Sequence, residues 1–187
     1  MQSGKTPGPD GFPSEFFKQF SKPLSAQFAA VLLESHKRGS LPPSLTEAVI
    51  TFIAKKGKDP VDCASFRPIS LLNTDAKILA KVLALRLDEA LPHIIPTDQT
   101  GFIKNRHLFF NIRRLLDVPY TPSHDQIPEC IVSIDAEKAF DRVEWNYLFS
   151  VLDKYGFGPM FAVRIKLLYA APAAMVQTDG ITFNLLG

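Results

Sequence analysis

Near the start of the chain, residues at helical spacing predict two consecutive helices. The residues of the longer pattern lie three or four positions apart: Leu24, Phe28, Val31, Leu32 and Ser35. With Gly39 standing where a C-terminal cap belongs, they predict an amphipathic helix over 24–38. A shorter helix is predicted over 15–20, and Pro23 separates the two.

Two apolar runs rich in β-branched residues predict a pair of strands. The runs 47–54 (EAVITFIA) and 66–72 lie on either side of the basic segment 55–60. This pattern is typical of a strand, a loop and a return strand.

The rest of the chain alternates predicted helices with short strands. Asn73 or Thr74 is expected to cap a helix that runs to Leu91. Its expected buried positions include Ile78, Val82, Leu85 and Leu87 or Leu91. The further elements are a helix over 107–117, a linker over 119–128, a strand over 130–135, helices over 144–155 and 159–170, and strands over 173–178 and 181–186 joined by Asp179-Gly180. Helices with short antiparallel strands and hairpins predict an α+β fold.

The composition fits a folded domain and excludes several classes of protein. The 187 residues, 46% of them hydrophobic, suffice for one domain or slightly more. Apolar runs fall far short of the roughly 20 residues of a membrane span, and the first residues lack a signal-peptide core. We therefore expect an intracellular protein of the cytoplasm or nucleus that is not secreted. Cys63 and Cys130 stand apart, which predicts buried thiols in a reducing compartment and excludes a disulfide scaffold and a zinc site.

The net charge of +2 hides an uneven distribution. Residues 1–117 carry 16 Lys and Arg against 11 Asp and Glu, a net charge of +5, whereas residues 118–187 carry 5 against 8, a net charge of −3. Phosphates could lie against the first part and a divalent cation within the second. Taken alone, the charges are more simply explained as ordinary solvated surface.

Asp135 is the first candidate for chemistry. It follows the apolar run 130–134, so the predicted strand would present its carboxylate at the strand's end. A carboxylate there can bind Mg²⁺, which prefers oxygen ligands. One carboxylate does not make a site, and an aspartate that starts a turn after a strand explains the residue equally well.

Two cationic segments are the other candidates. Lys55 at the hairpin tip and Arg67 on the return strand could hold a triphosphate. Taken alone, this pattern favours a solvated turn, since lysine on an edge hairpin also blocks strand pairing. The second segment carries cations interleaved with aromatic residues and would suit a nucleic-acid backbone: Lys104, Arg106, Arg113 and Arg114. Neighbouring residues at helical spacing are more simply core positions: Leu108, Ile112 and Leu115.

The order of five sequence blocks is more specific than any one of them. The blocks are GKTPGPDGFP at 4–13, IAKKGKD at 53–59, FRPISLLN at 66–73, DQTGFI at 98–103 and SIDAEKAFDRV at 133–143. In this order they resemble the reverse transcriptases of non-LTR (LINE-type) retrotransposons. The resemblance covers nearly the whole chain.

The resemblance implies a right-hand polymerase fold, with a fingers-like region over 1–129 and the start of the palm over 130–187. It also implies an RNA template, a DNA primer, deoxynucleoside triphosphates and Mg²⁺ as partners. The family continues with an aromatic-x-Asp-Asp hairpin that supplies further metal ligands, and these 187 residues contain no Asp-Asp pair. We therefore expect a fragment that lacks a C-terminal palm and thumb segment and is inactive alone.

The family's functional residues correspond to particular positions of this chain. The resemblance implies that Asp135, with the Ala136 carbonyl, binds the catalytic Mg²⁺ ions. It implies that Phe140 excludes nucleotides bearing a ribose 2′-OH, and that Lys55 and Arg67 contact the triphosphate.

Two functions of other classes remain open. A non-catalytic RNA-binding or interaction module would keep the cationic surface, and its RNA affinity would fall as salt rises. A phosphotransferase dependent on Asp135 is disfavoured, because the chain has neither a D-x-D pair nor a glycine-rich phosphate loop.

Overall fold

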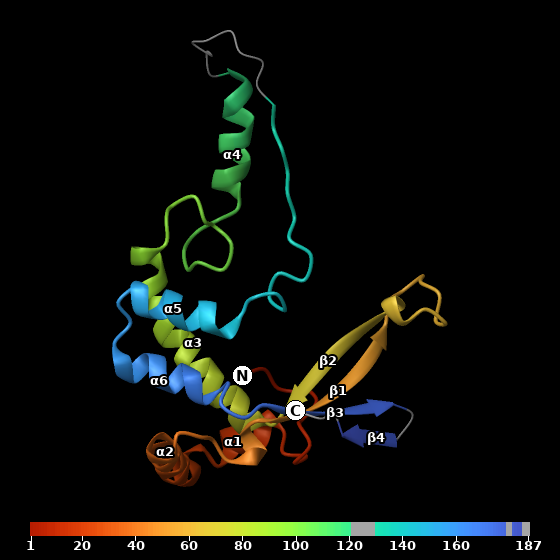
Figure 1. The fold of residues 1–187 in the computed structure, drawn as a ribbon, viewed down its shortest axis with the longest axis vertical. Coiled ribbons are helices and arrows are strands. Elements are labelled where there is room, and N and C mark those ends of the chain that lie inside the picture. Colours follow the sequence, from red (N-terminus) through yellow and green to blue (C-terminus); the bar gives the residue numbers. More distant parts are fainter. Residues whose placement is uncertain (121–129, 179–180, 185–187) are drawn as a thin grey trace. The chain divides into compact units, whose positions relative to one another are not determined.

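The computed structural model describes residues 1–120, 130–178 and 181–184, whose elements are drawn in Figure 1. The helices are α1 (Ser14–Gln19), α2 (Ser21–Arg38), α3 (Thr74–Ile94), α4 (Phe109–Asp117), α5 (Trp145–Lys154) and α6 (Pro159–Leu167). The strands are β1 (Glu47–Ala54), β2 (Phe66–Leu72), β3 (Ala173–Thr178) and β4 (Ile181–Asn184). Short 3₁₀ turns lie at Pro43–Leu45, Cys63–Ser65 and Val118–Tyr120. The mixture of helices and short strands agrees with the predicted fold class.

The chain divides into two compact units. The first, here called the sheet unit, combines Met1–Leu83 with the residues from Leu152 onward, and the second, here called the insert unit, is Ala84–Val151. The chain leaves the sheet unit within α3 and returns to it within α5. These two units differ from the predicted fingers (1–129) and palm (130–187) regions. The predicted boundary at 129/130 is a functional one, and it stays a prediction.

One four-stranded sheet, in the order β2-β1-β3-β4, organises the sheet unit (Figure 1). β1 pairs antiparallel with β2 from Ala48↔Leu72 to Ala54↔Phe66, and β3 pairs antiparallel with β4. β1 also pairs in parallel with β3. This pairing joins the two hairpins into one sheet, and the sequence did not predict it. The predicted turn Asp179-Gly180 lies outside the described residues, as do residues 121–129 of the linker and 185–187.

A small leucine-rich core packs the helices of the sheet unit together. Its buried residues are Leu41, Leu45, Ala76, Leu79, Leu83 and Leu167, and partly buried side chains of α2 and α6 pack against them. The predicted buried face of α3 was wrong at Val82 and Leu85, which are 43% and 51% exposed. α3 carries apolar residues on more than one side, so spacing alone could not identify the side that meets Leu41 and Leu167.

The ends of the elements follow the expected chemistry with small shifts. Gly39 adopts the left-handed conformation (φ 71°) at the end of α2, as a C-terminal cap requires. The prediction that Pro23 separates the two helices was wrong, because the break lies at Phe20 and α2 begins at Ser21. Pro23 lies in the first turn of α2, where a missing N–H costs no helical hydrogen bond. α3 continues through Pro92 to Ile94.

The predicted strand over 130–135 is absent. Residues 130–136 form neither helix nor strand, and Ile131, Val132 and Ile134 are exposed. A strand needs a neighbour to receive its backbone hydrogen bonds, and no ladder of the described sheet includes these residues. The β-branched composition therefore did not suffice to form a strand here.

Two further expectations of burial are also wrong. Cys63 and Cys130 are free thiols, but both are exposed. All of α4 except Asn111 is exposed, and so is Leu108 just before it, so the residues expected to be core are all exposed: Leu108, Ile112 and Leu115. None of the helices in residues 1–120, 130–178 and 181–184 combines the length and the hydropathy of a membrane-spanning segment.

Candidate functional site

The β1–β2 hairpin places Lys55 and Arg67 on one face. Arg67 lies directly opposite Ile53 in the antiparallel register, so the two side chains share a face. Lys55 comes two residues after Ile53, and its N–H donates to Ser65 O (2.8 Å), which continues the ladder by one residue. Because side chains alternate between faces, Lys55 lies on the same face as Arg67, in a diagonal position.

The loop that follows β1 holds Lys55 in place. The Lys55 ammonium donates to Ala64 O (2.7 Å), and the Asp62 carboxylate caps the turn at Cys63–Ser65 by accepting from Ala64 N (2.9 Å). An ammonium has three donors, so this bond leaves two directions for a ligand. The Arg67 side chain is exposed on an edge strand. The hairpin thus offers two cations on one rigid face, an arrangement that can bind phosphate.

The segment that carries Asp135 is built differently. Asp135 and Ala136 are exposed and precede a turn over 137–142. In this turn the N–H groups of Asp141 and Arg142 donate to Lys138 O (3.0 and 3.2 Å). The side chains of Glu137 and Arg142 form an ion pair at 3.0 Å. The turn is therefore held by local contacts, and Asp135 lies two residues before it.

The residues do not form a complete metal site. The Asp135 carboxylate and the Ala136 carbonyl are oxygen donors of the kind that Mg²⁺ prefers. Within the described residues, however, no group of three Asp, Glu, His or Cys side chains comes together as a metal site. These donors alone do not fit two catalytic metal ions, which need carboxylates from more than one segment.

Phe140 lies at the surface in contact with a residue from another sequence block. Its ring is 81% exposed, and it meets the ring of Phe102, which is 88% exposed. The ring centroids are 6.0 Å apart and the planes cross at 82°, an edge-to-face pair. Both residues belong to the insert unit.

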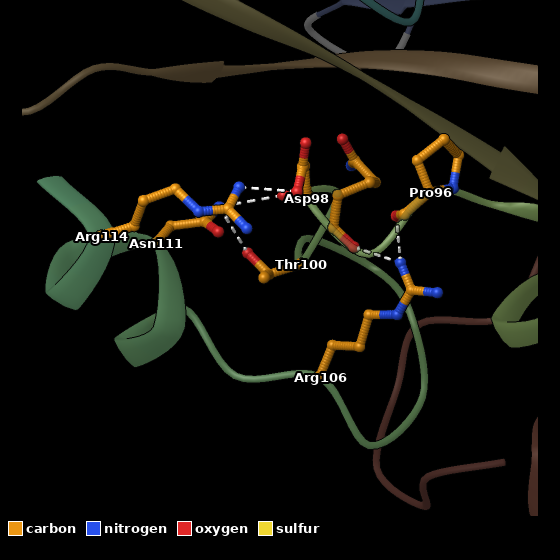
Figure 2. A network of polar contacts seen from close by, with 7 residues as sticks. Pro96, Asp98, Thr100, Arg106, Asn111 and Arg114 are labelled. Carbon is orange, nitrogen blue, oxygen red and sulfur yellow. Dashed lines mark hydrogen bonds and ion pairs between the residues drawn. The ribbon is translucent and has the colours of Figure 1, made fainter. Parts of the chain in front are cut away.

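Arg106 fixes the loop after α3. As Figure 2 shows in part, its guanidinium approaches the backbone near Pro96. It donates to four carbonyls, those of Pro92 (3.0 Å), Ile95 (2.8 Å), Pro96 (2.5 Å) and Gln99 (2.8 Å). Three of these lie at or just beyond the end of α3, where helical carbonyls lack partners and a cation is favourable. Arg106, which was predicted to bind nucleic acid, thus uses its guanidinium to hold the loop after α3.

The other three predicted nucleic-acid-binding cations differ in their surroundings. Arg114 forms an ion pair with Asp98 (2.6 Å), and Asn111 donates to Thr100 Oγ1 (3.0 Å), so α4 is tied to the same loop (Figure 2). Arg113 lies 3.9 Å from Asp117, the limit of an ion pair, and Lys104 is exposed. Lys104 and Arg113 are therefore the more available cations of the four.

An attachment that sequence reasoning missed joins the N-terminal block to the start of α3. Two hydrogen bonds make it: Asp10 N–H donates to Asn73 Oδ1 (3.1 Å), and Thr74 Oγ1 donates to Phe12 O (2.8 Å). Asn73 Nδ2 also donates to Ser44 O (2.8 Å), in the turn that precedes β1. A Cβ on Gly8 would lie 2.5 Å from Asn73 Cα, so only glycine fits there. In the sequence, Gly8 within the PGPDG motif was the residue that could have indicated this close packing. Burial and the adjacent Asp10 carboxylate raise the pKa of Asp75, beside this attachment.

Comparison with known proteins agrees with the sequence blocks. Residues 53–184 match the family described as reverse transcriptase (RNA-dependent DNA polymerase). An uncharacterized 149 kDa protein of transposon TX1 from Xenopus laevis is 39% identical over 179 residues, which are 96% of this chain and 14% of that protein. The Pol polyprotein from the type-2 retrotransposable element R2DM of Drosophila melanogaster is 27% identical over 94% of this chain and 16% of its own length.

A third relative also matches most of this chain over a small part of its own length. The RNA-directed DNA polymerase from mobile element jockey of Drosophila melanogaster is 28% identical over 82% of this chain and 17% of its own length. The chain thus spans between 14% and 17% of the length of these three relatives. All the predicted site residues lie within the residues that match the family.

Proposed function

The chain belongs to the reverse transcriptase family, as a domain of the LINE type, and we propose that it binds the incoming nucleotide and the nucleic acid for RNA-directed DNA synthesis. The single observation that carries this proposal is the position of Lys55 and Arg67. The family match includes both residues, and the hairpin register gives them one face.

On this proposal Lys55 and Arg67 contact the triphosphate of a deoxynucleotide. The planar guanidinium of Arg67 can donate two hydrogen bonds to phosphate oxygens, and the Lys55 ammonium adds a point charge. The paired strand fixes the backbone of both residues, so little ordering is needed when the ligand binds.

Asp135 and Ala136 would supply one carboxylate and one carbonyl ligand to Mg²⁺, and Phe140 would exclude the ribose 2′-OH. A bound metal would neutralise phosphate charge and activate the primer hydroxyl. Because the described residues do not form a complete metal site, we derive no catalytic step from them. The 187 residues alone are expected to bind substrate without polymerising it.

Lys104, Arg106, Arg113 and Arg114 would contact the backbone of the RNA template or DNA primer. Since Arg106 and Arg114 already bind carbonyls and a carboxylate, Lys104 and Arg113 would contribute more of the affinity. If the chain binds RNA and not nucleotide, the second candidate function applies, a non-catalytic RNA-binding module. The exposure of Lys104 and Arg113 is the observation that favours it. We place either function inside the cell, where two exposed free thiols stay reduced.

Nucleotide binding tests the first proposal. The chain is titrated with thymidine triphosphate and Mg²⁺, followed by calorimetry. Arg67→Ala removes charge-assisted hydrogen bonds and should weaken binding about tenfold or more. Arg38→Ala, which removes an exposed arginine paired with Glu34 along α2, is the matched control and should leave binding unchanged. Equal affinities of R67A and the unaltered chain would contradict the proposal.

A further inference from the structure

Two exposed phenylalanine rings meet although their blocks lie far apart in the sequence. Phe102 belongs to the DQTGFI block and Phe140 to the SIDAEKAFDRV block. Their edge-to-face contact at 6.0 Å joins the two blocks within the insert unit. Neither ring is buried, so the contact is not part of a hydrophobic core. A contact between two such rings orients each of them.

The backbone on the Phe102 side is held in an unusual conformation. Phe102 has a φ of 60°, in the left-handed region that bulky side chains avoid. Asn105, of a residue type that adopts this region more readily, has a φ of 63° in the same loop. Such a conformation persists only where the surroundings impose it. Here the four hydrogen bonds from Arg106 to the backbone of residues 92–99 restrain the loop that contains both residues.

The Phe140 side shows the same kind of restraint. Lys138 has a φ of 50°, and its carbonyl accepts from two N–H groups of the turn 137–142. The ion pair between Glu137 and Arg142 closes this turn. Two restrained loops therefore present the two rings to each other, and solvent surrounds the rest of each ring.

From this geometry we propose that Phe102 is a positioning residue for sugar selection, which acts by holding the ring of Phe140 in one orientation. The inference rests on the proposed role of Phe140 in excluding the ribose 2′-OH. A ring can exclude one additional oxygen only if its orientation is fixed, because a ring that turns freely about its side-chain bonds can move aside. Phe140 is too exposed to be fixed by a core, and the ring of Phe102 contacts it.

The first measurement tests the contact without any ligand. 4-Fluorophenylalanine is incorporated at position 140, and its fluorine resonance is recorded in the complete chain. Phe102→Leu removes the neighbouring ring and should shift and broaden this resonance, whereas Phe102→Tyr keeps a ring and should restore it. Phe109→Leu is the matched control, since Phe109 is exposed in the same unit and pairs with Phe110 instead. An unchanged resonance in F102L overturns the proposal.

The second measurement tests selection. The ratio of dissociation constants for uridine triphosphate and deoxyuridine triphosphate, each with Mg²⁺, is determined for each variant. F102L should reduce this ratio about threefold, F102Y should restore it, and F109L should leave it unchanged. Because Phe102 and Phe109 are both exposed, the melting curves of these variants should coincide, which separates selection from folding.

The outcomes distinguish this inference from the proposed function. If F140A lowers the ratio and F102L does not, Phe102 has no positioning role while Phe140 keeps its own. If F140A has no effect, or the unaltered chain binds neither nucleotide, the proposed role of Phe140 fails and this inference fails with it. A lowered ratio in both F140A and F102L, with rescue by F102Y, supports the inference.

Discussion

Two segments with similar strand-forming sequences have different structures in this chain. Residues 47–54 (EAVITFIA) form β1, which pairs with β2 on one edge and with β3 on the other. Residues 130–135 (CIVSID) are similarly apolar and β-branched, yet they form no strand and expose Ile131, Val132 and Ile134. The difference lies in available partners, since β1 has neighbours on both sides while 130–135 joins no ladder of the described sheet.

The same difference separates the two groups of candidate residues, each within its own unit. Lys55 and Arg67 belong to a paired hairpin, so their relative position is fixed by the ladder. Asp135 ends a segment without a ladder, so nothing comparable fixes its carboxylate. The hairpin that we propose to bind nucleotide is therefore organised, whereas the segment that we propose to bind metal offers one exposed carboxylate.

The largest expected effect comes from proline placed in each segment. Val49→Pro removes a backbone donor and strains a central strand, and should destabilise the chain by about 3 kcal/mol or more. Val132→Pro, at a residue 71% exposed and outside any strand, should change stability by less than about 0.5 kcal/mol. Urea unfolding followed by circular dichroism measures both. Similar losses in the two variants would mean that 130–135 is a paired strand after all.

A smaller effect is expected where glycine is required by close packing. Gly8→Ala places a Cβ 2.5 Å from Asn73 Cα, and the resulting backbone shift should cost about 1–3 kcal/mol. Gly158→Ala is the control, because no atom lies within 4 Å of its Cβ position. The same unfolding experiment should show G158A at or above the stability of the unaltered chain. A neutral G8A would show that the N-terminal block is not fastened to α3.

The smallest expected effect is a pH-dependent one at Asp75. Burial, with the nearby Asp10 carboxylate, raises the pKa of Asp75 above its ordinary value of 3.8, although an N–H of Ala76 opposes the shift. The folded state thus binds this proton more tightly than the unfolded state, so the destabilisation is absent below pH 3.8 and complete above the raised pKa.

Asp75→Asn removes this penalty and should stabilise the chain at neutral pH by no more than about 0.5 kcal/mol. The gain is small because Asp75 is only partly buried and because its carboxylate also interacts favourably with the N-terminus of α3. Melting curves from pH 3 to pH 7 should show the stability of D75N rising relative to the unaltered chain. A difference that does not vary with pH would contradict the assignment.

The sequence predicted local elements well and their partners poorly. The strands 47–54 and 66–72 and the cap at Gly39 could be read from neighbouring residues, because turn chemistry and alternation are local. The parallel pairing of β1 with β3 could not, since it joins residues more than 120 positions apart. The buried face of α3 was misplaced because several faces of that helix are apolar.

The candidate site residues show the same difference between what neighbouring residues predict and what distant contacts decide. Lys55 and Arg67 could be selected as candidates from the hairpin pattern and the family blocks, and their contact with nucleotide stays a prediction. The structural position of Arg106 was not, because its carbonyl partners are backbone groups that every sequence contains. The role of Asn73 depends on contacts with Asp10 and Ser44, which only the fold brings together.

The most direct test of the account is primer extension by the 187-residue chain. The reaction contains an RNA template annealed to a DNA primer, deoxynucleoside triphosphates and Mg²⁺, with the Asp135→Ala variant in parallel. Because two-metal chemistry needs more carboxylates than Asp135 provides, we predict no extension above a reaction without protein, and no difference between the two chains. Extension by the unaltered chain that disappears in D135A would contradict the account.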